Sequence, residues 1–527
     1  MTGITVFEER MSKKHVIDKS KFIDEFCCKF FDEGNEVILR PPGFGKTFNL
    51  SMLHCFLSDS IPLERTNKIF KDCWIRRQSS AWNTHRGNYP VVFLSLSECS
   101  FTNWRQMREF LESRIDELIS LHIPNLDNRE PTWAISNLKQ DRSALSVCDL
   151  AICYKYVIHQ LFDDKGKRVI LLVDDFDAPW RLRMESASDE SCRNKFFRCL
   201  FGLCIASHVV KVLFVGTVLP LIELETVPDT DNIFPMDSLR YKDCFGFTKK
   251  EAARLVGPCS MSGIRVGDAK MMSPKRVLGI PGSSLADVVG EDEILIACFA
   301  KSVAMLLLRR PIRILPLEGI MNASKSEEWF RDQALEYFAL MGFLAYRRHT
   351  QVMFDGVGRR YGNVWISCDD LFREWQNALI GISGFSSIEE LMQFFNPLID
   401  MLGTTETPEI ITKISTLMDS LAVRVKRRTI LYDLFTAGLI LTLKKSSDHS
   451  LDVKHEFLSR AWFLRISRMN QSMILVFRDT VAPWAAVTGY VTAELLTEHN
   501  HTVTHSVECL LCPDTPAVEK LENMCGH

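Results

Sequence analysis

The stretch Glu36-Val-Ile-Leu-Arg-Pro-Pro-Gly-Phe-Gly-Lys-Thr-Phe-Asn-Leu-Ser-Met-Leu53 decides the fold of the N-terminal part of the chain. Residues 37–39 form a short apolar run that ends at two prolines, which predicts a buried strand. From Thr47 onward, apolar residues recur at the spacing of a helix face. The stretch therefore predicts a strand, a glycine-containing turn and a helix, in that order.

The turn itself, Gly43-Phe44-Gly45-Lys46-Thr47, has the composition of a phosphate-binding loop. In such a loop the backbone amides and the helix N-terminus face an anion. Lys46 would supply a mobile cation, and the hydroxyl of Thr47 can hold Mg²⁺. The strict motif has a glycine six positions before the lysine, where this chain has Arg40. An ordinary strand-to-helix turn is therefore the alternative.

A second motif follows at Lys167-Arg-Val-Ile-Leu-Leu-Val-Asp-Asp-Phe-Asp-Ala-Pro-Trp180. Residues 169–173 predict a strand that is buried on both faces of a parallel sheet. The strand ends in Asp174 and Asp175, at the edge where open α/β sheets bind ligands. There Asp174 can hold a metal through water, and Asp175 can orient an attacking water. The alternative is a solvated strand end.

Two further apolar runs, residues 89–96 and 209–217, fit the same sheet. Helical patterns at 104–119 and 195–207 separate the strands. Strands that alternate with helices are typical of a doubly wound α/β domain with a parallel sheet.

The composition limits the classes of function. The chain has 527 residues with a formal net charge of −3, which suggests about two to four domains and excludes a protein that mainly coats nucleic acid. The start of the chain lacks the apolar core of a signal peptide, so the 17 cysteines are expected to be reduced thiols of a soluble intracellular protein, cytoplasmic or nuclear. No apolar run reaches the length that spans a membrane, so no membrane partner is expected.

About the first 250 residues resemble the AAA-ATPase-like domain family, whose members often carry a C-terminal module of the PD-(D/E)XK nuclease superfamily. The family's loop reads Arg-Pro-Arg-Arg-Phe-Gly-Lys-Ser-Leu-Asn-Leu-Ser-Met, which is similar to residues 40–52. An arginine at the position of Arg40 is therefore usual in this family. Four more landmarks resemble the family in the same order: Val16-Ile-Asp-Lys-Ser20, Tyr89-Pro-Val-Val92, Leu172-Val-Asp-Asp-Phe-Asp-Ala-Pro179 and Phe245-Gly-Phe-Thr-Lys-Lys-Glu251.

The resemblance implies that the protein binds ATP and Mg²⁺. It also implies the site residues: Arg40, Gly43, Phe44, Gly45, Lys46, Thr47 and Thr217 around the nucleotide, Thr47 and Asp174 at the metal, and Lys46 and Asp175 in catalysis. One departure matters, because Asp175 stands where the family has glutamate. A side chain shorter by roughly 1.5 Å should slow hydrolysis and leave binding intact.

The resemblance also divides the chain into a P-loop domain (1–250), a mostly helical lid or winged-helix-like linker (251–410), a small restriction-endonuclease-like α/β module (411–480) and a divergent tail (481–527). Trp462, Val476 and Arg478 occupy the positions of the nuclease acid, glutamate and lysine. Indole and isopropyl groups cannot ligate Mg²⁺, so the nuclease site is expected to have decayed. In a shifted register, the spare acids are Asp452, Glu456 and Asp479.

Two groups of residues in the C-terminal region, and the function of the whole protein, each leave alternatives open. A basic cluster (Arg424, Lys426, Arg427, Arg428, and further arginines through Arg478) can grip nucleic acid or be a solvated face. Cysteines and histidines in the tail, among them Cys509, Cys512, Cys525 and His527, can bind zinc or remain free. The sequence predicts an ATP-binding, weakly hydrolysing protein; the alternatives are a metal-dependent DNA nuclease regulated by the P-loop domain, and a catalytically silent interaction protein.

Overall fold

A computed structural model describes these residues of the chain: 7–9, 11, 16–28, 35–124, 136, 138, 142, 145–182, 184–203, 208–217, 232–236, 238–258, 263–280, 282–290, 292–314, 327–348, 362–401, 407–425, 430–445, 451–458, 461–468, 471–479 and 502–511. The last four of these ranges are described through their backbone. They form two compact units. The N-terminal unit comprises residues 1–282 and 337–347, and the C-terminal unit comprises residues 283–336 and 348–527. The boundary that the sequence suggested near residue 250 lies inside the N-terminal unit.

A five-stranded parallel sheet forms the centre of the N-terminal unit. Its strands, in spatial order, are β2 (Val91–Ser95), β3 (Val169–Asp174), β4 (Val209–Gly216), β1 (Glu36–Leu39) and β5 (Asn232–Phe234). All six residues of β3 are buried, because both faces of a parallel sheet are covered and a continuous aliphatic run satisfies both. The predicted α/β class with a parallel sheet is confirmed.

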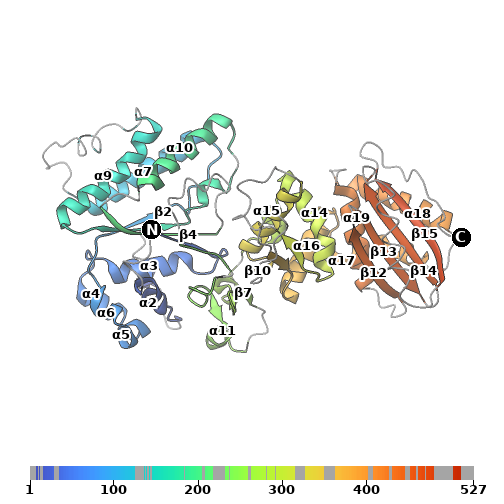
Figure 1. The fold of residues 1–527 in the computed structure, drawn as a ribbon, viewed down its shortest axis with the longest axis horizontal. Coiled ribbons are helices and arrows are strands. Elements are labelled where there is room, and N and C mark those ends of the chain that lie inside the picture. The colour runs from blue at the N-terminus through green and yellow to red at the C-terminus, as the bar shows by residue number, and fades with distance from the viewer. Residues whose placement is uncertain are drawn as a thin grey trace, which may run out of the picture. The chain divides into compact units, whose positions relative to one another are not determined.

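Helices cover both faces of this sheet, as Figure 1 shows. On one face lie α7 (Trp104–His122), α9 (Val147–Lys165) and α10 (Ala187–Leu203); on the other lie α2 (Lys21–Cys27) and α3 (Lys46–Leu57). The short helices α4 (Leu63–Ile69), α5 (Trp74–Gln78) and α6 (Ala81–Thr84) follow α3, and the 3₁₀ turn η3 (Ala178–Trp180) follows β3. This arrangement leaves the carboxyl ends of β1, β3 and β4 beside the N-terminus of α3.

A small antiparallel sheet completes the N-terminal unit. It consists of β6 (Phe247–Thr248), β8 (Ala269–Met272) and β7 (Ile264–Val266), with α11 (Lys249–Val256) and α12 (Pro274–Val277) next to it in the chain. The end of α15 (Glu327–Leu340) and most of β10 (Ala345–Arg348) also belong to this unit. Leu340 of α15 joins the main hydrophobic core.

The C-terminal unit combines helices with a mixed sheet. Its other elements are α13 (Leu285–Val289), α14 (Glu293–Leu307), β9 (Ile312–Ile314), β11 (Gly362–Trp365), α16 (Asp369–Ile382), α17 (Ile388–Met401), α18 (Thr407–Arg424), α19 (Leu431–Lys445), β12 (Leu451–Leu458), β13 (Ala461–Arg468), β14 (Gln471–Asp479) and β15 (Thr502–Leu511). The strands β12, β13 and β14 pair antiparallel in order, and β15 pairs parallel with β14. The stretch expected to be a divergent tail thus contributes a strand. None of the helices in the described residues has the length and hydropathy required to cross a bilayer.

Candidate functional site

The loop between β1 and α3 has the backbone of an anion-binding turn. Gly43 and Gly45 have φ angles of 77° and 81°, in the left-handed region where glycine is the residue without a steric penalty. Gly45 is the N-cap of α3 and no side chain caps that helix. The first amides of a helix have no acceptor within it, so those of α3 are available to an anion at this point.

Arg40 anchors this loop from inside the protein. Its side chain is fully buried, and its guanidinium donates hydrogen bonds to the carbonyl oxygens of Phe234, Pro235 and Tyr241 at 2.9, 3.2 and 3.1 Å. It also lies over the ring of Phe245, 5.5 Å from the centroid. The sequence placed Arg40 among the nucleotide-binding residues, whereas the structure engages its guanidinium with the chain that follows β5.

The small sheet supports the other side of the loop. The ring of Phe44 is buried, and the carbonyl of Phe44 accepts a hydrogen bond from the amide of Gly246 at 2.9 Å. The hydroxyl of Ser273 donates to the carbonyl of Gly43 at 3.3 Å. Two methylene groups of the exposed Lys275 also pack against Gly43: a β-carbon added at Gly43 would lie only 3.0–3.1 Å from them. Phe44 thus packs inward, and the side chain of Lys275 packs against the loop at Gly43.

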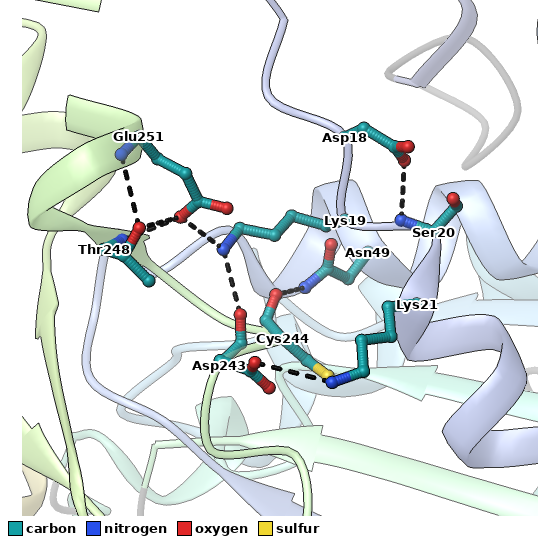
Figure 2. A network of polar contacts seen from close by, with 9 residues as sticks. All are labelled: Asp18, Lys19, Ser20, Lys21, Asn49, Asp243, Cys244, Thr248 and Glu251. Carbon is teal, nitrogen blue, oxygen red and sulfur yellow. Dashed lines mark hydrogen bonds and ion pairs between the residues drawn. The ribbon is translucent and has the colours of Figure 1, made fainter. Parts of the chain in front are cut away.

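Figure 2 shows how a polar network joins three sequence landmarks. The buried Lys19 donates to the carbonyl of Asp243 at 2.9 Å and forms an ion pair of 2.8 Å with Glu251. Glu251 also completes the capping box of α11 with Thr248. Asn49 of α3 donates to the carbonyl of Cys244 at 3.0 Å. The segments around residues 19, 49 and 246 are therefore held together behind the loop.

Lys46 places its ammonium group at the centre of the site. The side chain is 8% exposed, and Nζ donates to the carbonyls of Arg40 and Pro41 at 3.2 and 3.4 Å. It also donates to Oγ1 of Thr217 at 2.9 Å and lies 3.7 Å from Oδ1 of Asp175. The structure therefore brings together Lys46, Thr217 and Asp175 from three separate segments. Thr217 directly follows β4.

Asp174 is a buried carboxyl group with unsatisfied oxygens. It is 0% exposed, and neither oxygen accepts a well-aligned hydrogen bond from the described residues. Burial, and next the charge of Asp175, raise the pKa of Asp174 from 3.8 to about 7; the Thr47 hydroxyl and Lys46 act in the opposite direction. Thr47 and Lys46 are therefore the neighbours of Asp174 in the fold.

Asp175 has an unusual backbone and two cationic neighbours. Its φ of 49° lies in the left-handed region, which aspartate tolerates better than most residues. Its Oδ1 lies 3.0 Å from Nη2 of Arg181 and 3.7 Å from Nζ of Lys46. The two cations therefore hold the Asp175 carboxylate beside Lys46.

The sequence reasoning missed two residues, Asp177 and Arg181. Asp177 is buried, its pKa is raised by burial, and the amide of Thr217 hydrogen bonds to it. Arg181 lies 3.6 Å from Asp177; burial acts to lower the pKa of Arg181, but Asp177 and then Asp175 outweigh burial and raise it. The signal for Asp177 was its place in the run Asp174-Asp-Phe-Asp-Ala-Pro179. Arg181 lies beyond that run, and only the turn after β3 brings it back to the acids.

The residues present fit a divalent cation. Asp174 and the hydroxyl of Thr47 are oxygen donors of the kind that Mg²⁺ prefers, and the Asp174 oxygens have no well-aligned donor among the described residues. Three carboxyl groups (Asp174, Asp175, Asp177) face two cations (Lys46, Arg181) here. A bound cation would relieve both the missing contacts and the excess negative charge.

The C-terminal positions can be placed by their strand register. Trp462 of β13 pairs with Phe477 of β14, and Val476 and Arg478 of β14 pair with Phe463 and Ala461 of β13. The spare acids Asp452 and Glu456 lie on β12, and Asp479 is the last residue of β14. The basic residues Lys426, Arg427 and Arg428 and the tail residues Cys512, Cys525 and His527 lie outside the described residues.

Residues 1–225 match a family model described as a predicted AAA-ATPase. No curated protein matches the chain. The match includes β1, α3, β3 and β4 and so covers the loop together with Asp174, Asp175 and Asp177, while the Phe245–Glu251 landmark lies beyond it. The first 225 residues are thus similar to a predicted AAA-ATPase domain, a likeness that indicates nucleotide binding.

Proposed function

We propose that the protein binds ATP together with Mg²⁺ at the loop between β1 and α3. The observation that carries this proposal is that Oγ1 of Thr217 and Oδ1 of Asp175 both lie within 4 Å of the Lys46 ammonium group. Asp175 and Thr217 directly follow the neighbouring parallel strands β3 and β4, and Lys46 is the first residue of α3. Open α/β sheets bind ligands at the carboxyl ends of their strands. An ordinary strand-to-helix turn would not explain why the buried Lys46 lies near Asp174, a buried carboxyl group with unsatisfied oxygens.

Each residue has a distinct role in this proposal. The amides of Gly45, Lys46 and Thr47 at the start of α3 bind phosphate oxygens. Lys46 gives up the carbonyls of Arg40 and Pro41 and donates to the phosphates. Thr47 and Asp174 hold Mg²⁺, which when bound screens the negative charge of the phosphates. Because Asp174 must be ionised for this role, binding removes the proton that burial favours.

We further propose that ATP hydrolysis is slow. Asp175 would orient the attacking water, and its short side chain is held by Arg181 at 3.0 Å. Arg181 acts on the reaction through Asp175 and is therefore a positioning residue. A carboxylate that is held too far from the attacking water orients that water poorly, which slows hydrolysis. ATP binding does not need this contact with the water.

Binding is tested by titrating the full chain with ATP and Mg²⁺ in a calorimeter. Loss of a charge-assisted hydrogen bond costs about 1.5–3 kcal/mol, so Lys46→Ala should weaken ATP affinity roughly 10- to 100-fold. The matched control is Lys71→Ala, since Lys71 is exposed and pairs only with its neighbour Asp72 among the described residues. Equal affinity of the Lys46 variant and the wild type would refute nucleotide binding at this loop.

Hydrolysis is tested separately by phosphate release at saturating ATP. If Asp175 orients the water, Asp175→Glu should raise kcat several-fold and Asp175→Asn should lower it, with little change in ATP affinity. Arg181→Ala should change kcat more than KM, because Arg181 contacts Asp175 and Asp177. Turnover that is unaffected by all three changes would refute the proposed role of Asp175. A wild-type protein that binds ATP and releases no phosphate would be a nucleotide-binding switch that does not hydrolyse ATP.

For the C-terminal unit we propose a nuclease-like module that has lost its metal site. The succession of α19, the antiparallel strands β12–β14 and the parallel strand β15 supports a small α/β module. Trp462, Val476 and Arg478 lie on adjacent strands, and the first two cannot ligate Mg²⁺. Nucleic-acid binding through its arginines is part of this proposal. Cleavage of plasmid DNA with Mg²⁺ or Mn²⁺, lost in Asp452→Asn or Glu456→Gln, would overturn the proposed decay.

A further inference from the structure

Two cysteines on neighbouring helices lie unusually close together. Sγ of Cys148, at the start of α9, is 2.8 Å from Sγ of Cys199, near the end of α10. Both side chains are partly exposed. A disulfide bond is about 2.05 Å long, so the sulfur atoms need to approach by only about 0.8 Å to bond. The packed helices α9 and α10 already hold the thiols in place.

From this contact we propose that Cys148 and Cys199 form a reversible disulfide that joins α9 to α10 when the protein meets a low-molecular-weight disulfide such as oxidised glutathione. The other described cysteines of known exposure are mostly buried. Cys192, on α10 with Cys199, is partly exposed and serves as the comparison.

The exchange proceeds in two balanced steps. The Cys148 thiolate attacks one sulfur of oxidised glutathione, forms a mixed disulfide and releases one glutathione thiolate. The Cys199 thiolate then attacks Sγ of Cys148, closes the protein disulfide and releases the second glutathione thiolate. Two protein thiols are oxidised, one glutathione disulfide is reduced to two thiols, and the two protein protons pass to the solvent and the released thiolates.

The order of attack follows from the surroundings of the two sulfurs. Burial, and next the hydrogen bond with Cys148, raise the pKa of Cys199 to about 11, while Lys195 and Arg198 act in the opposite direction. Cys199 is therefore a poor first nucleophile in the reduced pair. Once Cys148 is a mixed disulfide, that hydrogen bond is gone and the two nearby cations favour the Cys199 thiolate.

The bond would close a segment that contains the acidic part of the site. The two cysteines are 51 positions apart, and the segment between them carries β3, Asp174, Asp175, Asp177 and Arg181. Closing a loop of this length restricts the unfolded chain. The oxidised protein should therefore melt on the order of 5 °C above the reduced protein.

The test equilibrates the full chain in mixtures of reduced and oxidised glutathione, blocks free thiols, digests the protein without reduction and identifies cross-linked peptides by mass spectrometry. We expect a peptide pair joining Cys148 to Cys199 in the wild type and in Cys192→Ser, and none in Cys148→Ser or Cys199→Ser. The rise in melting temperature should follow the same pattern, and dithiothreitol should reverse it.

Two results would overturn the proposal. One is the absence of the Cys148–Cys199 peptide from wild-type protein at every glutathione ratio, which needs no variant to interpret. The other is a melting temperature that responds equally to oxidation in the wild type and in Cys199→Ser. Neither result depends on nucleotide binding, so the proposal stands or falls independently of the proposed function.

Discussion

Replacing Asp174 with asparagine should stabilise the protein while removing the carboxylate that we propose holds Mg²⁺. Burial and the neighbouring charge of Asp175 raise the pKa of Asp174 from 3.8 to about 7. In the unfolded chain the carboxyl group ionises at its ordinary pKa, so between pH 4 and 7 the folded state holds a proton that the unfolded state has lost. Stability contributed by this group therefore falls as the pH rises, and the full penalty is present above pH 7.

The size of the penalty follows from the difference between the two pKa values. The rise from 3.8 to about 7 spans about three pH units, and each unit corresponds to about 1.4 kcal/mol. The ionised Asp174 thus costs the folded protein about 4 kcal/mol at pH 8. At pH 5.5 the folded-state carboxyl is still protonated, and the cost is smaller by about 2 kcal/mol. Asp174→Asn removes the charge and so removes this pH-dependent part.

The assay is urea unfolding followed by circular dichroism, without nucleotide or metal, at pH 8 and pH 5.5. Asp174→Asn should raise the unfolding free energy relative to the wild type, and the gain should be larger at pH 8 by about 2 kcal/mol. Asp72→Asn is the control, since that side chain is 82% exposed and should show no such difference. A gain that is equal at both pH values, or larger at pH 5.5, would refute the assignment of a buried, proton-holding carboxyl group.

In the proposed site, the same carboxyl group couples Mg²⁺ binding to proton release. Mg²⁺ with ATP needs the ionised form of Asp174, so binding at pH 6.5 should release part of a proton to the buffer. Calorimetry in two buffers with different ionisation enthalpies measures that release. The wild type should show it and Asp174→Asn should not, and the variant should lose most of the Mg²⁺-dependent affinity for ATP.

Three further changes test how the loop is held. Gly246→Ala should lower the unfolding free energy by about 2–3 kcal/mol and weaken ATP binding, because a β-carbon there would stand 2.9 Å from the ring of Phe44 at a φ of 82°. Gly166→Ala is the control, since Gly166 has a left-handed backbone and open space around it, and it should lower the unfolding free energy by only about 1 kcal/mol. Equal losses would count against the contact with Phe44. Lys19→Met should lower the unfolding free energy, measured by chemical denaturation, by about 3 kcal/mol, because it leaves the carboxylate of Glu251 without its buried partner. Adding Glu251→Gln should restore part of that loss. Additive effects in the double variant would show that the two residues are not coupled. Lys275→Ala should weaken ATP binding about 3- to 10-fold in calorimetry, and an unchanged affinity would show that its ammonium group does not reach the phosphates.

Much of the proposed nucleotide site could be predicted from local sequence. The β-strand ending at Leu39, the two glycines and Lys46-Thr47 are adjacent in the chain, and each position has a local physical requirement. A buried run ending in Asp174-Asp175 likewise marks the carboxyl end of a central strand. The structure confirms the parallel sheet and brings these acids to Lys46.

Other parts of the site depend on contacts between distant segments. Arg40 was read as a nucleotide-binding residue because it belongs to the loop motif, but its guanidinium finds its acceptors about 195 positions later, at the carbonyls of residues 234–241. Arg181 belongs to no sequence motif. It lies 3.0 Å from Asp175 because the chain turns after β3, where Asp175 has a left-handed backbone. The segment around Ser273 was assigned to a separate lid, yet it hydrogen bonds to Gly43.

The sequence alone located the turn that we propose binds a polyphosphate, because anion recognition by a helix N-terminus needs only a few adjacent residues of fixed type and spacing. The tertiary structure decided which groups surround that turn: Lys19 with Glu251 behind it, Arg181 on Asp175, and the thiol of Cys148 against that of Cys199. Such pairs join segments separated by tens or hundreds of residues. Their geometry is set by how helices and strands pack, and packing is a property of the whole core rather than of any short stretch.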